Sequence, residues 1–75
     1  MGERVWLGKP PSACDICRRP ILRTFVDGRT RSGQWAIMCP TCRVDFGPAE
    51  LGVGRGQKYE AQGAGETRKW IKTGG

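Results

Sequence analysis

Four cysteines are the residues of this chain whose type and spacing carry recognisable chemistry. They form two pairs, Cys14–Cys17 and Cys39–Cys42, with two residues inside each pair and 21 residues between the pairs. Two intervening residues let one tight turn present both thiolates to a single ion, and two such turns complete a tetrahedron of sulfur ligands. The spacing therefore predicts one structural zinc ion held by Cys14, Cys17, Cys39 and Cys42.

Other cysteine chemistries fit this pattern less well. Iron stays open as an alternative, because a four-thiolate tetrahedron accepts either ion. Two disulfides would suit a secreted chain, but the N-terminal residues contain no apolar signal core, and cytosolic thiols stay reduced. A thioredoxin-like role needs one exposed pair on a larger βαβ scaffold. Because four protein ligands close the zinc site to water, we expect it to support the fold and not to catalyse.

Length and composition exclude several functions. The chain has 75 residues, a net charge of +6 and no histidine. A chain of this size makes one small domain, and its core needs additional stabilisation, for example by a metal ion or disulfides. The missing histidine removes Ser–His and Cys–His catalysis, so we expect no enzyme and no small-molecule substrate. The longest apolar run, residues 35–39, is too short to cross a bilayer, so we expect a cytoplasmic protein without a membrane partner.

The elements around the cysteines follow from turn and cap signals. Residues 21–26 and 34–38 have strand composition, and Asp27–Gly28 is a strong turn dipeptide, so we expect a hairpin with its tip within 27–33. Pro40 suits a first helical turn and Gly47–Pro48 suits a helix end, which predicts a helix over 40–46. A cysteine turn, a hairpin and a cysteine turn that opens a helix describe a treble-clef finger. A zinc ribbon, the alternative, requires residues 43–47 to be non-helical.

The remaining segments complete a small metal-stabilised α+β organisation. We expect an N-terminal arm over 1–13, the zinc module over 14–47, a glycine-rich connector over 48–57 and a C-terminal β-hairpin with its tail over 58–75. The strands of that hairpin are expected over 57–62 and 67–72, around Gly63–Gly65. An isolated hairpin is marginal in water, so it should dock on the zinc module or bind a ligand.

Two resemblances to known families add to this prediction. Cys14–x–x–Cys17, the hairpin with Asp27–Gly28, and Met38–Cys39–x–x–Cys42 entering a helix resemble GATA-type treble-clef zinc fingers over residues 14–47. The stretches TFVDGRTRSGQWAIMC and GVGRGQKYE are similar to short four-cysteine zinc-finger proteins of bacteriophages and prophages. The second resemblance implies a phage or prophage origin and work in the host cytoplasm, on nucleic acid or on a host protein.

Positive charge gathers in two segments. Residues 18–31 carry a net charge of +4 and residues 55–72 a net charge of +3, and nine of the thirteen basic residues are arginine, which suits bidentate phosphate and guanine contacts. Candidate nucleic-acid contacts are the basic residues of these segments with one tryptophan: Arg18, Arg19, Arg23, Arg29, Arg31, Arg55, Lys58, Arg68, Lys69, Trp70 and Lys72.

The aromatic side chains are expected to supply core area, because the chain has few aliphatic residues. Phe25 and Trp35, on opposite strands of the first hairpin, are predicted to pack. Trp70 lies among basic residues and is the best candidate for stacking on a nucleic-acid base, although docking on the zinc module is its default role. The function expected from the sequence is a zinc-stabilised module that binds DNA or RNA. The alternative is an interaction module for a host transcription or defence protein.

Overall fold

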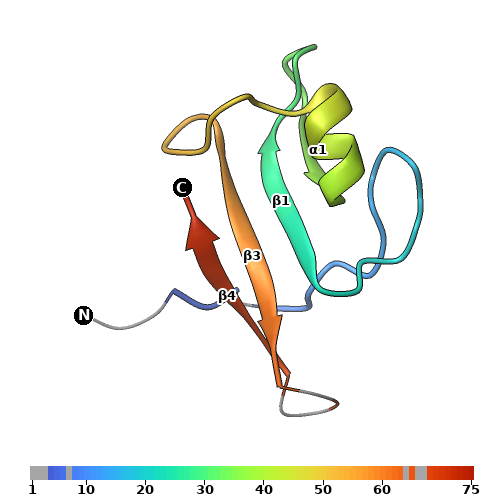
Figure 1. Cartoon of the computed structure of the whole chain (residues 1–75), viewed down its shortest axis with the longest axis vertical. Coiled ribbons are helices and arrows are strands. Elements are labelled where there is room, and N and C mark those ends of the chain that lie inside the picture. Colours follow the sequence, from blue (N-terminus) through green and yellow to red (C-terminus); the bar gives the residue numbers. More distant parts are fainter. Residues whose placement is uncertain (1–3, 7, 64, 66–67) are drawn as a thin grey trace.

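A four-stranded antiparallel sheet and one helix make up the described part of the chain (Figure 1). The computed structural model describes residues 4–6, 8–63, 65 and 68–75. The strands lie side by side in the order β2-β1-β3-β4, and every neighbouring pair is antiparallel. The elements are β1 (Thr24–Arg29), β2 (Trp35–Met38), α1 (Pro40–Phe46), β3 (Gly56–Gln62) and β4 (Lys69–Gly74). The chain is thus a small α+β protein, as its sequence predicts.

The first hairpin forms, but its turn lies further along the chain than Asp27–Gly28. Both residues belong to β1, where Asp27 pairs with Ile37 and Gly28 with Ala36. The reversal occurs over residues 30–33, where the Thr30 amide donates to the Gln34 carbonyl and Gly33 has a φ of +99°. The turn therefore lies within the expected tip at 27–33, but Asp27–Gly28, the dipeptide predicted to form it, belongs to a strand.

The helix predicted over 40–46 is confirmed with those bounds. Cys39 is its N-cap and Pro40 occupies its first turn, where a missing amide costs nothing. At the other end, the Gly47 amide donates to the Arg43 carbonyl, and a Cβ at Gly47 would lie 2.7 Å from that oxygen and 3.1 Å from Met38 Sδ. Only glycine lets the chain leave the helix so close to β2, which seats α1 against the first hairpin.

The C-terminal hairpin docks by extending the sheet. β3 pairs with β1 in a register that places Phe25 opposite Tyr59, and β4 pairs with β3. The N-terminal arm adds to the outer edge of β4, where the Trp6 amide donates to the Trp70 carbonyl at 2.9 Å and Val5 bridges Ile71. The segments expected to be separate hairpins therefore share one sheet. Residues 1–3, 7, 64 and 66–67, which fall in the expected arm and hairpin, lie outside the described residues.

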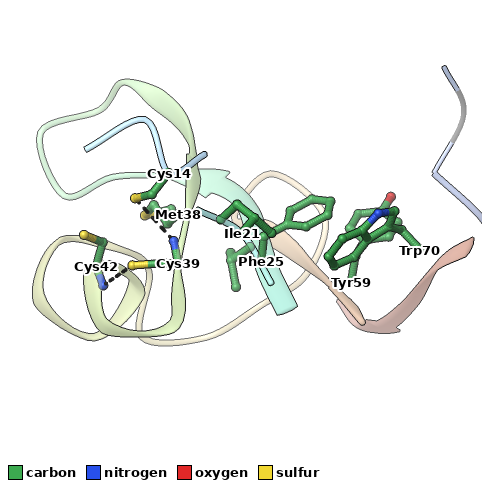
Figure 2. Close-up of a cluster of buried hydrophobic side chains, with 9 residues drawn as sticks. Cys14, Ile21, Phe25, Met38, Cys39, Cys42, Tyr59 and Trp70 are labelled. Carbon is green, nitrogen blue, oxygen red and sulfur yellow. Dashed lines mark hydrogen bonds between the residues drawn. The ribbon is translucent and has the colours of Figure 1, made fainter. Parts of the chain in front are cut away.

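The core is one continuous cluster with a sulfur-rich end and an aromatic end (Figure 2). Phe25, 1% exposed, stacks on Tyr59 with ring centroids 5.2 Å apart, and its centroid lies 5.1 Å from that of Trp70. Trp6 meets both Phe25 and Tyr59 edge-on, the favoured geometry for opposed ring quadrupoles. Ile21 and Met38 lie between these rings and the cysteines.

The expectation that both aromatic residues of the first hairpin pack is half wrong. Phe25 is buried, but Trp35 is 53% exposed. Trp35 stands at the first position of β2, opposite Arg29 and beyond the reach of the aromatic cluster. Among the described residues, no helix is long and apolar enough to cross a membrane.

Candidate metal centre and basic surface

The first cysteine pair lies in a tight turn that the backbone closes on itself. The Cys14 amide donates to the Arg19 carbonyl, the Arg18 amide donates to the Cys14 carbonyl at 3.0 Å, and Ala13 bridges Pro20. Arg18 has a φ of +67°, the left-handed conformation that reverses the chain directly after Cys17. This turn brings Cys14 and Cys17 to the same side, as the two-residue spacing requires.

The second cysteine pair belongs to the start of α1. Cys39 ends the approach from β2 and caps the helix, and its Sγ accepts a hydrogen bond from the Cys42 amide at 3.5 Å. The Cys42 amide is one of the N-terminal amides that an α-helix leaves without a partner inside the helix, and the Cys39 sulfur accepts from it. The helix therefore presents Cys39 and Cys42 together, on the side that faces the first turn.

The two turns meet so that all four sulfurs lie within 4.8 Å of one another. Cys14 Sγ accepts from the Cys39 amide at 3.4 Å (Figure 2). Cys17 Sγ lies 3.7 Å from Cys39 Sγ. A tetrahedron with Zn–S bonds of about 2.3 Å requires sulfurs ~3.8 Å apart. The Cys17–Cys39 distance matches that value, and all four cysteines are free of disulfide bonds. The four predicted ligands thus gather into one cluster that could hold a metal ion.

The pKa values of two thiols in this cluster are shifted in opposite directions. Burial opposes ionisation of Cys14, but backbone amide donors, those of Cys39 and Ile16 among them, outweigh it and lower the pKa of that thiol to about 6. Burial raises the pKa of Cys42 to about 12, and contacts with the other sulfurs add to the rise. Four thiolates at this spacing repel one another, so a cation must balance them. A divalent ion supplies that balance.

The first cysteine turn is also tied to the sheet by an acidic side chain. The Asp15 amide donates to the Ile37 carbonyl, and the Ile37 amide donates to Asp15 Oδ2, both at 2.8 Å. These bonds satisfy part of the outer edge of β2, which is an edge strand of the sheet among the described residues. No pattern in the sequence predicts this contact. It fixes the distance between the turn and β2, and therefore between Cys14 and Cys39.

The pairing of β1 with β3 brings the two basic segments, 18–31 and 55–72, side by side. Eight of the eleven candidate contacts are exposed, namely Arg18, Arg19, Arg23, Arg29, Arg31, Arg55, Arg68 and Lys69. Lys58 and Lys72 are half-buried in the sheet. The exposed residues separate into groups. Arg29 and Arg55 meet where the Arg29 amide donates to the Arg55 carbonyl, whereas Arg23 and Arg68 line one shallow hollow at the opposite end of β1.

Of the two roles considered for Trp70, its default role of packing in the core holds, and stacking on a nucleic-acid base does not. Trp70 is 5% exposed, and its ring belongs to the aromatic end of the core. The Arg68 guanidinium lies 5.1 Å from the Trp70 ring centroid and donates to the Leu22 carbonyl. The basic neighbours that suggested a stacking site instead cover a core residue.

Some basic side chains have partners within the protein. The Arg31 guanidinium donates to the carbonyls of Val44 and Asp45, at the C-terminal end of α1, which joins the hairpin tip to the helix. Arg55 pairs with Glu50 at 2.5 Å, and both side chains are exposed. Arg29 is exposed, and its side chain forms no hydrogen bond or salt bridge with another residue in the described part of the chain. The sequence could not distinguish these roles, because each of these residues is an arginine in a turn or strand and their partners are set by the tertiary structure.

Comparisons of the chain with protein-family models, with curated proteins and with solved structures found no match. The cysteine cluster and the charged surface are therefore the features of the protein that bear on its function.

Proposed function

We propose that this protein is a zinc-stabilised nucleic-acid-binding module with a treble-clef finger at residues 14–47. Support for the treble clef comes from the order of a cysteine turn, the β1–β2 hairpin and a second cysteine turn that opens α1. A zinc ribbon would place residues 43–47 outside a helix, and residues 43–46 are helical. The resemblance to phage and prophage finger proteins further suggests a regulatory or accessory role in a host cytoplasm.

The observation that carries nucleic-acid binding is the excess of unneutralised basic side chains on the sheet and its turns. Lysine and arginine number thirteen against seven acidic residues, and one salt bridge, Arg55–Glu50, forms among the described residues. A zinc ion with four thiolates carries −2, which lowers the net charge of the loaded protein from +6 to +4. Phosphate backbones are the polyanions that such arginine-rich surfaces attract most strongly.

Salt dependence tests this proposal. The zinc-loaded protein should bind short DNA or RNA at about 50 mM salt, and its affinity should fall steeply towards ~200 mM because phosphate contacts release counterions. Arg29→Ala should reduce the slope of log K against log salt by roughly 0.7 to 0.9, the share of one phosphate contact. Lys9→Ala, an exposed residue outside both basic segments, is the matched control. Absence of any binding at the lower salt concentration would refute the proposal.

A protein partner is the second candidate, and two exposed apolar side chains of α1 favour it. Val44 and Phe46 are 69% and 49% exposed on a seven-residue helix. Apolar side chains of this kind contribute to protein interfaces and not to phosphate contacts. Val44→Ala with Phe46→Ala should leave nucleic-acid affinity unchanged, but should abolish recovery of a host protein from nuclease-treated lysate if that partner exists.

A further inference from the structure

Trp35 combines high exposure with a fixed orientation. Its indole is 53% exposed at the start of β2, and its Nε1 donates to Asp27 Oδ1 at 2.5 Å. Asp27 is half-buried in the middle of β1, a position where aspartate is disfavoured. Isolated exposed apolar residues are common on protein surfaces. Trp35 differs from these because a carboxylate in the neighbouring strand holds its ring in place.

The register of the hairpin places a basic residue next to Trp35. Arg29 pairs directly with Trp35, so both side chains leave the same face of the sheet with Cβ atoms about 5 Å apart. Asp27 and Ile37 form the next pair on that face, followed by Phe25 and Tyr59. Trp6 covers the Phe25–Tyr59 end of this face, which leaves the Trp35–Arg29 end open.

A double helix is a poor ligand for this surface. α1 has seven residues, Val44, Asp45 and Phe46 are among its exposed side chains, and Arg31 occupies the carbonyls at its end. Such a helix offers little to a major groove, whose bases are read by bidentate basic or amide side chains. An exposed aromatic ring beside an arginine suits a strand whose bases are unstacked, because each base has a free π-face.

On the assumption that the proposed nucleic-acid binding holds, we propose that Trp35 is a stacking platform for one base of single-stranded DNA or RNA. Arg29 contacts the phosphate next to that base, and Asp27 is a positioning residue that holds the indole through its Oδ1. The binding surface is thus the open end of the β1–β2 face, and the expected ligand class is unpaired polynucleotide.

Variants of Trp35 test the platform on the zinc-loaded full chain. The probes are fluorescent oligothymidylate and oligouridylate of about ten nucleotides and a DNA duplex of similar length. The native protein should bind both single strands more tightly than the duplex. Trp35→Ala should weaken single-strand binding by roughly tenfold, whereas Trp35→Phe should retain most of it. Val53→Ala, which shortens a 96% exposed side chain on the connector, is the control and should bind as the native protein does.

Two variants of Asp27 separate positioning from charge. Asp27→Asn and Asp27→Ala both remove the negative charge, but only asparagine keeps an acceptor for the Trp35 indole. The Asp27→Asn variant should therefore bind single strands at least as tightly as the native protein does. The Asp27→Ala variant should bind them several-fold more weakly than the Asp27→Asn variant. If Asp27 had a purely structural role, the Asp27→Ala variant would have a lower unfolding midpoint. The two folded variants would then bind single strands with equal affinity.

The outcomes distinguish this inference from the function on which it depends. No binding of any probe at about 50 mM salt would refute both. Native binding that Trp35→Ala leaves unchanged, or a native preference for the duplex, would refute the platform and leave nucleic-acid binding intact. Loss of single-strand affinity in Trp35→Ala, with zinc content and circular dichroism unchanged, would establish the platform.

Discussion

The four cysteines differ in exposure but share one role. Cys14, Cys39 and Cys42 are buried, whereas Cys17 is exposed at the rim of the cluster. Exposure often marks a replaceable residue, but Cys17 Sγ lies 3.7 Å from Cys39 Sγ, which is a ligand-to-ligand distance. Its importance therefore follows from geometry and not from burial.

Cys17→Ser should accordingly damage the site as severely as replacement of a buried cysteine. Loss of a direct thiolate ligand should cost more than the 10- to 100-fold in metal affinity that is typical of outer-shell changes, so a decrease of more than about 100-fold is expected. Competition with a chromophoric chelator measures it. Ile16→Ser, which alters a 37% exposed residue in the same turn, is the control and should change zinc affinity much less.

Single residues also show where sequence patterns stop being informative. The paired spacing was sufficient to predict all four sulfur ligands, because two-residue turns leave few other geometries. The exposure of Trp35 and the burial of Trp70 could not be predicted in the same way. Their burial depends on strand register and on Trp6, which reaches the core from the other end of the described chain. The basic residues around Trp70 suggested stacking on a base as an alternative to its default core role, and tertiary packing places the ring in the core.

At the scale of elements, the close approach of β1 and β3 explains why Gly28 stands inside a strand. Gly28 pairs with Gly56, and a Cβ on Gly28 would lie 3.0 Å from the Arg55 carbonyl oxygen and 3.2 Å from the Gly56 Cα. Both contacts are with backbone, which cannot move aside alone. The Asp–Gly dipeptide that predicted a turn instead meets this steric requirement, and the sequence holds no local signal that distinguishes the two uses.

Gly28→Ala should therefore separate β1 from β3 at this end and destabilise the protein. An overpacked contact of this kind costs about 1–3 kcal/mol, which exceeds the gain in strand propensity. Chemical denaturation of the zinc-loaded protein measures the change in the free energy of unfolding. Gln62→Ala changes an exposed position in β3 and serves as the control. Equal stability of both variants would contradict the close-packing argument.

At the scale of the whole molecule, the metal-binding cluster and the aromatic cluster belong to one core. Met38 is fully buried and adjoins Cys39, while Ile21 and Phe25 continue the packing to Tyr59 and Trp70 (Figure 2). The sequence predicted the zinc module and the C-terminal hairpin as successive segments. It could not predict that β3 would pair with β1, because the contact joins residues 28 to 36 positions apart and depends on the docking of complementary faces.

This continuity predicts that metal removal unfolds the chain as one unit. Zinc binding contributes ~10–16 kcal/mol in comparable peptides, more than a core of this size supplies by itself. A chelator should therefore abolish the near-ultraviolet circular dichroism of the aromatic cluster together with the amide dispersion of residues 14–42, and added zinc should restore both. Phe25→Leu, which weakens the aromatic end, should in turn lower the apparent zinc affinity, because folding and binding are linked. If the aromatic signal persisted while residues 14–42 lost their structure, the sheet would be stable without the metal, and the two ends of the core would be separate folding units.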